Sequence, residues 1–452
     1  MSTPRITFHG GVGSPTGSNF VLSTDTVQLM IDCGLAQGHQ PPGVDNRADF
    51  PYDPSSINAL VVTHGHLDHV GRIPKLVAAG FTGPVYSTAP TRAIAEHIFE
   101  DSLVIMQEEE RETGVPPLYT RVDIDRALSM WETKQYHESW SIRDATIELK
   151  DAGHILGSAF VEVTTGDTVT VFSGDLGNSG TPLLEETEAP TGAHYIVTES
   201  VYGDRNHEPV DARKDKLIKA IKRAVREQGA LLIPAFSIER TQVLLSELNE
   251  LIEGGTVPSI PVFLDSPLAI KITDVYREYS DYFNKEVQQT IAAGDDIFAF
   301  PKLTFTETVN DSKMISNVSG AKIIIAGSGM SHAGRIQHHE RQLLSDPSTT
   351  LLIVGFQAPG TLGRRIQDGA KRVTILGKEV RVRATVMSID GYSAHKDSDG
   401  LLEFVAGAGE QLKKAFVVLG EPKASQFLAQ RLHDYVGVDA IIPKLGETID
   451  LA

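Results

Sequence analysis

Apolar, β-branched runs alternate with amphipathic stretches along nearly the whole of this 452-residue chain, and this rhythm limits the folds that it can adopt. Such alternation is typical of layered α/β domains, in which helices cover the faces of a sheet. In the N-terminal part the strand-like runs end in polar or glycine-bearing turns. The strands predicted there are VQLMIDCG (27–34), NALVVTH (58–64), PVYSTA (84–89), ATIELKDAGH (145–154) and TVTVFSGD (168–175), and residues 91–110 have the spacing of a helix.

From about residue 206 the alternation becomes regular. The pattern predicts helices at 211–228, at 238–253 and near 334–344, separated by the strands GALLIPAF, IPVFLDSP, AKIIIAGSG and TTLLIVGF. Strands that alternate with helices favour a parallel sheet of the doubly wound type. Strand and helix signals continue after about residue 384, and no linker marks either border. We therefore predict a domain inserted at 206–384, whose flanks 1–205 and 385–452 together form one outer domain.

The composition restricts partners and location. The chain has 41 lysines and arginines against 59 aspartates and glutamates, a formal charge of −18, so a nucleic acid has to be drawn in by a local cleft. The single cysteine, Cys33, excludes an internal disulfide and a thiolate zinc cluster, and it fits a reducing compartment. The N-terminus lacks a secretory pattern, and no apolar run is long enough to span a membrane. We therefore expect a cytoplasmic protein with no membrane partner.

The segment HGHLDH places three histidines and an aspartate within six residues at the end of a predicted strand. His64 and His66 are two apart, so in an extended conformation their side chains point the same way, whereas Asp68 and His69 turn toward a neighbouring point. Imidazole and carboxylate are zinc ligands, and a catalytic zinc keeps one position open for water. Any one of these histidines alone is best explained as a surface residue. Four such side chains in this spacing instead favour one metal at His64 and His66 and a second at Asp68 and His69.

Other predicted strands end in further candidate ligands. DAGHILGSA places His154 in a glycine-flanked turn, and VFSGDLGN places Asp175 just after an apolar strand. An aspartate in that position often only forms a turn, but here its carboxylate could bridge two metals about 3.5 to 4 Å apart. Asp32 ends an early strand, and we predict that it orients a ligand histidine or the nucleophilic water.

The motifs HGHLDH, DAGHILGS and FSGDLGN resemble the signature of the metallo-β-lactamase superfamily, an αββα sandwich with a metal site along one edge. A second set resembles the β-CASP branch, which includes ribonuclease J and the endonuclease that cleaves eukaryotic pre-mRNA at its 3′ end. That set is VTESVYGDRNH, LLIPAFSIERTQVLL, FLDSPLA, AGSGMSHAGRIQHH and DGYSAHKD. The resemblance runs from GSPTGSNF near the N-terminus to the last strand. It implies that 206–384 fold as the β-CASP domain, a parallel, Rossmann-like α/β insertion, and that single-stranded RNA is the substrate.

The resemblance also implies roles outside the metal cluster. Glu199 can hydrogen-bond His395 and raise its affinity for a proton, which His395 then delivers to the departing ribose oxygen. A capping glutamate and an ordinary turn histidine are the alternatives for these two residues.

The candidate RNA-binding residues belong to the insertion. A loop of small residues can cradle a phosphate with its backbone N–H groups or can simply form a strand-to-helix turn, and both interpretations stay open. Arginines after PAFSIE and after the loop could supply local positive charge. His338 and His339 are assigned to packing or to a helix face. The candidate residues are Ser328, Gly329, Met330 and Ser331 in the loop, with Arg240, Arg335, Arg364 and Arg365.

One position departs from the family pattern. Related enzymes carry a second-metal histidine in a V-H-G-E strand end, whereas this chain reads FVVLGEPKA and has Leu419 there. The metal held by His64, His66, His154 and Asp175 keeps its full set of ligands, and the one served by Asp68, His69 and Asp175 loses one. We expect one firmly bound Zn²⁺ and a weak second site, with Mn²⁺ as an alternative ion. The nearest replacement ligands are Glu421 and His433.

The main hypothesis is a zinc-dependent ribonuclease that hydrolyses single-stranded RNA, internally or from the 5′ end. Its predicted catalytic residues are Asp68, Asp175, Glu199, His395 and Asp32. One alternative is a degenerate β-CASP protein that binds RNA or a partner nuclease without cutting. Another is an ester or lactone hydrolase of the same fold. The resemblance is also compatible with a homodimer.

Overall fold

The computed structural model describes residues 3–38, 40–358 and 360–451, and the chain divides into two compact units. The first unit comprises Met1–Asn206 and His395–Ala452, and the second comprises His207–Ala394. Strand β19 (Thr385–Ile389) pairs in parallel with β16 (Thr350–Val354), so it lies in the sheet of the second unit. The sequence interpretation had placed this segment in the outer domain, because a strand signal alone does not say which sheet the strand joins. Among the described residues, no helix has the length and apolar character that crossing a membrane requires.

The first unit contains two seven-stranded sheets. In one, the neighbouring strands β3, β4, β5 and β6 run parallel, while β22, β1, β2 and β3 pair antiparallel. In spatial order this sheet is β22 (Thr448–Asp450), β1 (Arg5–Phe8), β2 (Phe20–Ser23), β3 (Gln28–Ile31), β4 (Ala59–Val61), β5 (Val85–Ser87) and β6 (Trp131–Thr133). The other is β21 (Asp439–Ile441), β20 (Lys414–Val417), β11 (Tyr195–Thr198), β10 (Thr168–Phe172), β9 (Ala159–Thr165), β8 (Ala145–Asp151) and β7 (Trp140–Ile142).

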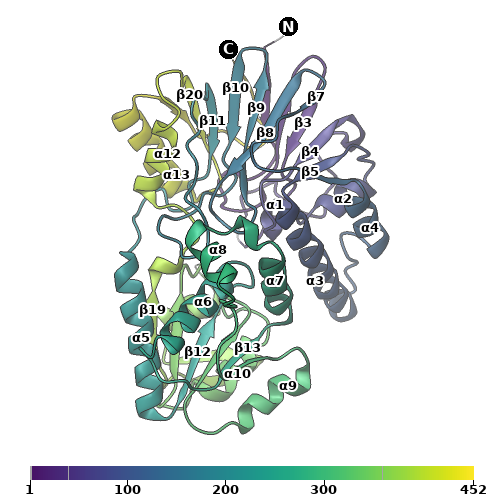
Figure 1. The fold of residues 1–452 in the computed structure, drawn as a ribbon. Coiled ribbons are helices and arrows are strands. Elements are labelled where there is room, and N and C mark those ends of the chain that lie inside the picture. The colour runs from purple at the N-terminus through teal and green to yellow at the C-terminus, as the bar shows by residue number, and fades with distance from the viewer. Residues whose placement is uncertain (1–2, 39, 359, 452) are drawn as a thin grey trace. The chain divides into compact units, whose positions relative to one another are not determined.

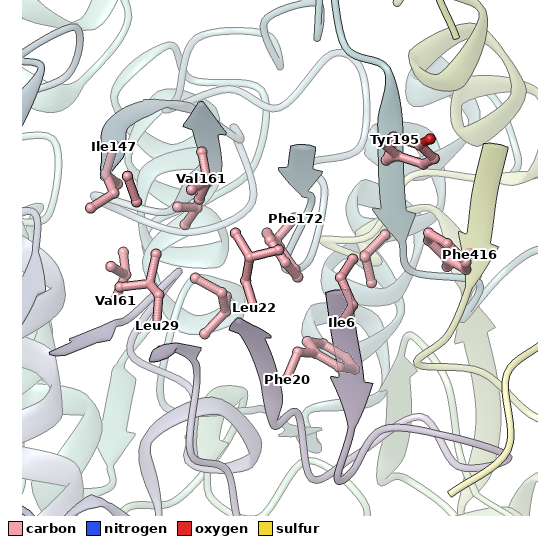
Figure 2. Packing of buried hydrophobic residues seen from close by; sticks show 14 of the residues in the cluster. Ile6, Phe20, Leu22, Leu29, Val61, Ile147, Val161, Phe172, Tyr195 and Phe416 are labelled. Atoms are coloured by element: carbon pink, nitrogen blue, oxygen red, sulfur yellow. The ribbon is translucent and has the colours of Figure 1, made fainter. Parts of the chain in front are cut away.

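Apolar side chains from both sheets form one core in the first unit (Figure 2). Phe20 and Leu22 are two apart on β2, so both face this core, and Val161 and Phe172 of the other sheet pack into it. Complete burial of such a side chain contributes roughly 1.5 to 3 kcal/mol. This core fixes the two sheets face to face and so fixes where their strand ends lie.

Helices cover the outer faces of both sheets in the first unit, which makes it an αββα sandwich and confirms the predicted fold class (Figure 1). On the second sheet, Leu401 and Leu428 from two C-terminal helices pack on Phe160 and Ile196. The helices of this unit are α1 (Leu67–Val70), α2 (Ile73–Ala78), α3 (Ala89–Thr113), α4 (Arg121–Ser129), α12 (Ser398–Ala406) and α13 (Pro422–Arg431). This unit also has two short helical turns, η1 (Pro54–Ser56) and, after α13, the π-helical turn η5 (Leu432–Val436). A further turn, η4 (Asp390–Tyr392), belongs to the second unit.

A side-chain cap and a glycine determine where helix α3 begins and ends. The Thr88 hydroxyl caps its N-terminus by accepting from the Thr91 N–H, and Gly114 ends it with φ of 77° in the left-handed region. The Thr88 hydroxyl also lies 2.6 Å from the Gly157 carbonyl. The start of α3 is therefore tied to the turn that follows β8, which carries His154.

The second unit is built on a six-stranded, fully parallel sheet. Its central strands are buried along their whole length, as expected for a sheet covered on both faces. The spatial order is β14 (Leu303–Phe305), β13 (Val262–Asp265), β15 (Lys322–Ala326), β12 (Ala230–Pro234), β16 and β19. The predicted parallel α/β architecture of the insertion is thus confirmed.

The helices of the second unit connect successive strands of this sheet. A separate two-stranded hairpin, β17 (Arg372–Ile375) and β18 (Lys378–Arg381), packs against two of them. The helices are α5 (Val210–Glu227), α6 (Arg240–Glu253), α7 (Pro267–Glu278), α8 (Lys285–Ala292), α9 (Val309–Met314), α10 (Ile336–Leu343) and α11 (Leu362–Gln367), with short turns η2 (Ser280–Tyr282) and η3 (Ile315–Asn317).

Candidate metal centre

Loops at the ends of separate strands of the first unit bring most of the predicted ligands together. His64 and His66 follow β4, and α1 carries Asp68 and His69. The other contributors are Asp32 after β3, His154 between β8 and β9, Asp175 after β10, Glu199 after β11 and His395 before α12.

Close backbone contacts allow these loops to meet. A Cβ on Gly34 would lie 1.5 Å from the Asp68 carbonyl oxygen, so no larger residue fits there without displacing the histidine segment. Gly174 has φ of 54°, and a Cβ on it would lie 2.7 Å from the Thr63 side chain. The glycines beside Asp32 and Asp175 therefore permit the approach of the loop that carries His64.

Four potential ligand atoms converge on one point. His66 Nδ1 lies 3.0 Å from His64 Nε2 and 3.3 Å from His154 Nε2. Asp175 Oδ2 lies 3.5 Å from His64 Nε2 and 3.6 Å from His154 Nε2. A tetrahedron with zinc–ligand bonds of about 2.0 to 2.1 Å has edges of about 3.3 to 3.4 Å. The spacing of these four atoms therefore suits a zinc-sized cation.

The protonation states of two of these residues also suit a cation. Burial, together with the neighbouring His69, holds the pKa of His64 well below its usual value, so the ring is neutral and can act as a ligand. Burial by itself raises the pKa of Asp175, but the nearby His69 and His395 outweigh it and hold that pKa well below the usual range. Asp175 is therefore an anion, although its side chain is only 4% exposed.

Asp32 has the orienting contacts predicted for it. Its Oδ2 lies 2.7 Å from His69 Nδ1, and its Oδ1 accepts from the Thr63 N–H at 2.8 Å. This contact turns His69 Nε2 toward Asp175 Oδ1, 3.3 Å away. Burial lowers the pKa of His69, but Asp175 and Asp32 outweigh it and hold that pKa well above the usual value. Burial raises the pKa of Asp68 to about 6, although His69 opposes the shift.

Two buried atoms support the fit of a cation. His69 Nε2 and Asp175 Oδ1 face each other at 3.3 Å, but neither makes a well-aligned hydrogen bond with a described residue, although both are shielded from water. Buried polar atoms are nearly always paired, so a ligand-bearing site explains this pair better than a structural one. Imidazole nitrogens and carboxylate oxygens are the donors that zinc takes, and we conclude that the residues present fit a divalent cation.

A second group shares Asp175 with the first. The potential ligand atoms of Asp175, Glu199 and His395 all lie within 4.8 Å of one another. Asp68 and His69, which the sequence pattern assigned to the second metal, form no such group with Asp175 among the described residues; His69 Nε2 lies 4.0 Å from Asp68 Oδ2. The second position predicted at Asp68 and His69 is thus less compact than the first.

Glu199 and His395 form the predicted pair. His395 Nδ1 lies 3.2 Å from Glu199 Oε2 and 3.9 Å from Asp175 Oδ2. The Leu176 N–H donates to Glu199 Oε1 at 2.6 Å, which fixes the carboxylate of this fully buried residue. Burial lowers the pKa of His395, but Glu199 and Asp175 outweigh it and raise that pKa to about 9. The His395 ring is therefore protonated at neutral pH.

Leu419 lies in the apolar core of the first unit and is 1% exposed. Its N–H donates to the Gly11 carbonyl at 2.7 Å, and its backbone has φ of 48°. The proposed replacements Glu421 and His433 are both exposed, and neither joins a group of potential ligands in the part of the chain that the structure describes. Neither residue is therefore supported as a substitute ligand.

The loop of small residues lies after β15 in the second unit. Some of its backbone N–H groups already make hydrogen bonds within the loop. The Ser328 N–H donates to the Ala333 carbonyl at 3.2 Å, and the Ser331 N–H donates to the Ser328 carbonyl at 3.1 Å. The Ser331 hydroxyl contacts Glu340 Oε1 at 2.5 Å. Of the four predicted residues, Gly329 and Met330 therefore remain as N–H donors for an anion.

Two of the four arginines proposed to supply positive charge, Arg240 and Arg335, make internal contacts in the second unit. Arg240 is 9% exposed, and its guanidinium donates to the Val354 carbonyl at 2.5 Å. Arg335 donates to Asp265 Oδ1 at 2.7 Å and to the Thr306 carbonyl at 2.8 Å. Their charges are thus directed toward backbone and a carboxylate, which does not fit the interpretation that both offer free positive charge.

Sequence reasoning missed several residues that hold the site. The Ser18 and Thr63 hydroxyls donate to Asp32 Oδ2, each at 2.9 Å, and Ser158 accepts from the His154 N–H at 2.9 Å. Each lies in a quoted motif, beside a glycine or a candidate ligand. Small hydroxyl residues in those motifs were the available signal.

Three family models match the chain. The model described as "Metallo-beta-lactamase superfamily" matches residues 15–235, "Beta-Casp domain" matches 241–366, and "Zn-dependent metallo-hydrolase RNA specificity domain" matches 379–443. A solved structure described as a protein of unknown function from Enterococcus faecalis V583 has a TM-score of 0.58 at 12% identity and covers 100% of both chains, which shows similarity of fold.

Curated relatives point the same way. "Ribonuclease TTHA0252" of Thermus thermophilus is 36% identical over 89% of this chain and 91% of the relative. "Transcription termination factor FttA" is 30% identical in Methanosarcina mazei and 31% identical in Pyrococcus horikoshii, in each case over 99% of this chain and 71% of the relative. The chain therefore belongs to the β-CASP ribonuclease family of the metallo-β-lactamase superfamily and is a metal-dependent hydrolase.

Proposed function

We propose that this protein hydrolyses phosphodiester bonds of single-stranded RNA with a zinc ion held by His64, His66, His154 and Asp175. The observation that carries the proposal is the convergence of these four ligand atoms beside the buried contact of Glu199 with His395. A ribose oxygen leaves poorly without a proton, so a cation beside a proton donor suits this reaction. The ribonuclease relative and the RNA specificity model support RNA as the substrate.

When bound, the ion would lower the pKa of a water beside it and would offset charge on the phosphoryl oxygens. We assign the other steps to residues of the chain. The water oxygen forms the new bond to phosphorus while the bond from phosphorus to the ribose oxygen breaks. Asp68, with a pKa of about 6, takes up the proton that the water loses. Asp32 keeps His69 in position through its contact with Nδ1.

His395 supplies the proton to the leaving oxygen. Its Nδ1 faces Glu199, so Nε2 is the nitrogen that delivers the proton. Because Glu199 stabilises the charged imidazole, the ring is protonated before each turnover. Glu199 therefore acts through His395 and not directly on RNA.

The proposal is tested with purified protein, added Zn²⁺ or Mn²⁺, an end-labelled unstructured RNA and a generic aryl ester. His66→Ala should lower RNA cleavage by at least about 1,000-fold, since it removes a ligand of the cation. His338→Ala is the matched control: His338 is an exposed histidine on α10 of the second unit, and its variant should cleave RNA normally.

Cleavage retained by His66→Ala would refute the metal assignment. RNA binding without cleavage by the wild-type protein would favour a degenerate binding protein, and ester hydrolysis without RNA cleavage would favour a small-molecule hydrolase.

A further inference from the structure

A strongly basic surface lies in the second unit on α11 and the hairpin of β17 and β18. Residues 364–383 carry seven lysines and arginines against two acidic residues, a net charge of +5 in a chain whose total is −18. The cations that are exposed are Arg365, Lys371, Arg372, Lys378, Arg381 and Arg383. We call these six residues the hairpin surface.

Strand alternation separates the two faces of this hairpin. Val373, Ile375 and Val380 are buried and pack in the apolar core with α10 and α11. The alternate positions point outward, and the register places Arg372 directly opposite Arg381. Like charges directly opposite each other destabilise a strand pair, so folding alone does not explain this arrangement.

Few of these cations are neutralised within the protein. Arg372 pairs with Glu379 at 2.6 Å, which uses one of the two acidic residues, and Arg364 pairs with Asp368 at 2.9 Å, which uses the other. The remaining cations form no ion pair with any described residue; they are Arg365, Lys371, Lys378, Arg381 and Arg383.

Helix α5 of the same unit provides the contrast. It is also basic, but five of its cations contact carboxylates. These pairs are Arg213 with Glu247, Lys214 with Glu250, Lys216 with Glu208, and both Arg223 and Arg226 with Glu227. The positive charge of helix α5 is thus largely balanced by carboxylates of the protein. Most of the charge of the hairpin surface is not, so it is available to an anionic ligand.

We propose that the hairpin surface binds the phosphate backbone of single-stranded RNA, as a second contact separate from the metal cluster of the first unit. Alternate residues of a strand are about 6.7 Å apart, and Arg381 at the end of β18 is followed by Arg383 two residues later in the chain, so the cations form a row, as an extended polyanion requires. The exposed face of this hairpin carries no aromatic ring, so the contact is with phosphates and is independent of base sequence. The inference rests on the proposed RNA substrate but not on cleavage.

The test measures RNA binding by the full-length protein with cleavage blocked by Asp175→Asn. A labelled oligouridine of about 30 nucleotides is titrated at several salt concentrations and followed by fluorescence anisotropy. Replacement of Arg372, Arg381 and Arg383 by glutamine should weaken binding at least about tenfold at low salt. It should also reduce the slope of log K against log salt by about 2, because each phosphate contact contributes about 0.7.

The matched control removes the same charge from α5 by replacing Lys219, Lys222 and Arg226 with glutamine, and it should change affinity less than about twofold. An opposite test adds net charge: Glu379→Gln removes the acidic residue of the outward face and should tighten binding. Equal weakening by both triple variants, or an unchanged salt slope in the hairpin variant, would overturn the proposal.

Failure of this inference can be told apart from failure of the proposed function. If the wild-type protein binds RNA through the hairpin surface but cleaves none, only the proposed hydrolysis is wrong. If it cleaves RNA while the hairpin variant binds RNA as the wild type does, only this inference is wrong.

Discussion

Two buried aspartates, one in each unit, look alike in sequence but have opposite surroundings. Asp175 follows the apolar strand β10 of the first unit, and Asp265 ends the apolar strand β13 of the second. Both are almost completely buried. Asp265 Oδ1 accepts from Arg335 and Thr306, each at 2.7 Å, and its Oδ2 lies 2.6 Å from both the Ser312 hydroxyl and His339 Nε2. Every lone-pair direction of that carboxylate is thus served by the protein.

Asp175 is left incomplete. Its Oδ1 has no hydrogen-bond partner among the described residues, and its Oδ2 faces two histidine nitrogens at 3.5 and 3.6 Å, longer than a hydrogen bond but close to the edge of a coordination tetrahedron. A carboxylate whose hydrogen bonds are all made within the protein stabilises a fold, whereas Asp175 Oδ2 faces the neutral ring of His64 at 3.5 Å and can take a cation. The difference between these aspartates separates the structural cluster from the candidate metal site.

The largest expected effect is a loss of activity when Asp175, in the candidate metal site, is replaced. Asp175→Asn should lower RNA cleavage by at least about 1,000-fold, because the variant loses the anionic ligand of the cation. Its far-UV circular dichroism should stay unchanged, since the neighbouring histidines can release their protons. Asp265→Asn, the matched change in the second unit, should retain the specific activity of the folded protein. Equal loss of activity in both variants would show that the two aspartates do not differ in function.

The next largest effect is a loss of stability when Asp265 is replaced. Asp265→Asn leaves Arg335 and His339 facing a neutral amide, and removing one partner of a buried ion pair typically costs about 3 kcal/mol or more. Arg335 retains some solvent contact, so we expect a loss of about 2 to 4 kcal/mol in the free energy of unfolding. Urea titration of the metal-free variant and wild type measures this loss. A midpoint that does not move would show that the four contacts of Asp265 contribute little.

Apolar periodicity and glycine turns are local signals, and they predicted a layered α/β fold, the parallel sheet of the insertion and the strand ends that carry the candidate ligands. The two sandwiched sheets were expected from the resemblance to the metallo-β-lactamase superfamily. The local pattern alone does not distinguish Asp175 from Asp265, since FSGDLG and FLDSP both read as an aspartate after an apolar strand; Asp175 was assigned to the metal because its motif accompanies the histidine motifs. Which side chains face an aspartate depends on contacts between residues far apart in the chain, such as Asp265 with His339. Those contacts leave no local pattern.

The same reason explains the misplaced roles. Arg240 reads as an exposed arginine near a helix start, but its guanidinium contacts the Val354 carbonyl on another strand. Leu419 was identified correctly as a residue that cannot bind a metal, but only the structure shows its side chain in the apolar core. Thr63 and Ser18 contact Asp32 from different loops, so their role could not be read from either loop alone.

A third experiment measures how much zinc binding to the candidate metal site stabilises the folded protein. Zinc at about 100 times its dissociation constant should stabilise the wild-type protein by about 2.7 kcal/mol, because it binds the folded state. The same addition should not stabilise His66→Ala, and it should stabilise Asp265→Asn as much as wild type. Differential scanning calorimetry with and without zinc gives these values, and elemental analysis should find close to one zinc per chain. Two tightly held zincs would contradict the weak second site expected from Leu419.

The smallest effect concerns the pH dependence of stability. Burial by itself raises the pKa of Asp265, but the hydrogen bonds from His339, Ser312, Thr306 and Arg335 outweigh it and lower that pKa to about 2. In the unfolded chain an aspartate has a pKa of about 3.9, so between pH 4 and pH 2 the unfolded state binds a proton that the folded state does not. The stabilisation, about 2.6 kcal/mol, is therefore nearly complete above about pH 4 and is lost as the pH falls through about 2.

The difference between wild type and Asp265→Asn in unfolding free energy isolates this effect, because the carboxylates of the first unit are common to both proteins and cancel. Measured without metal by urea titration, the difference should be constant from pH 7 to pH 5 and should shrink by about 2 kcal/mol as the pH falls from 4 to 2. A difference that stays constant down to pH 2 would mean that the charge of Asp265 is not what its four neighbours stabilise. The two aspartates would then differ in packing rather than in how completely their charge is balanced.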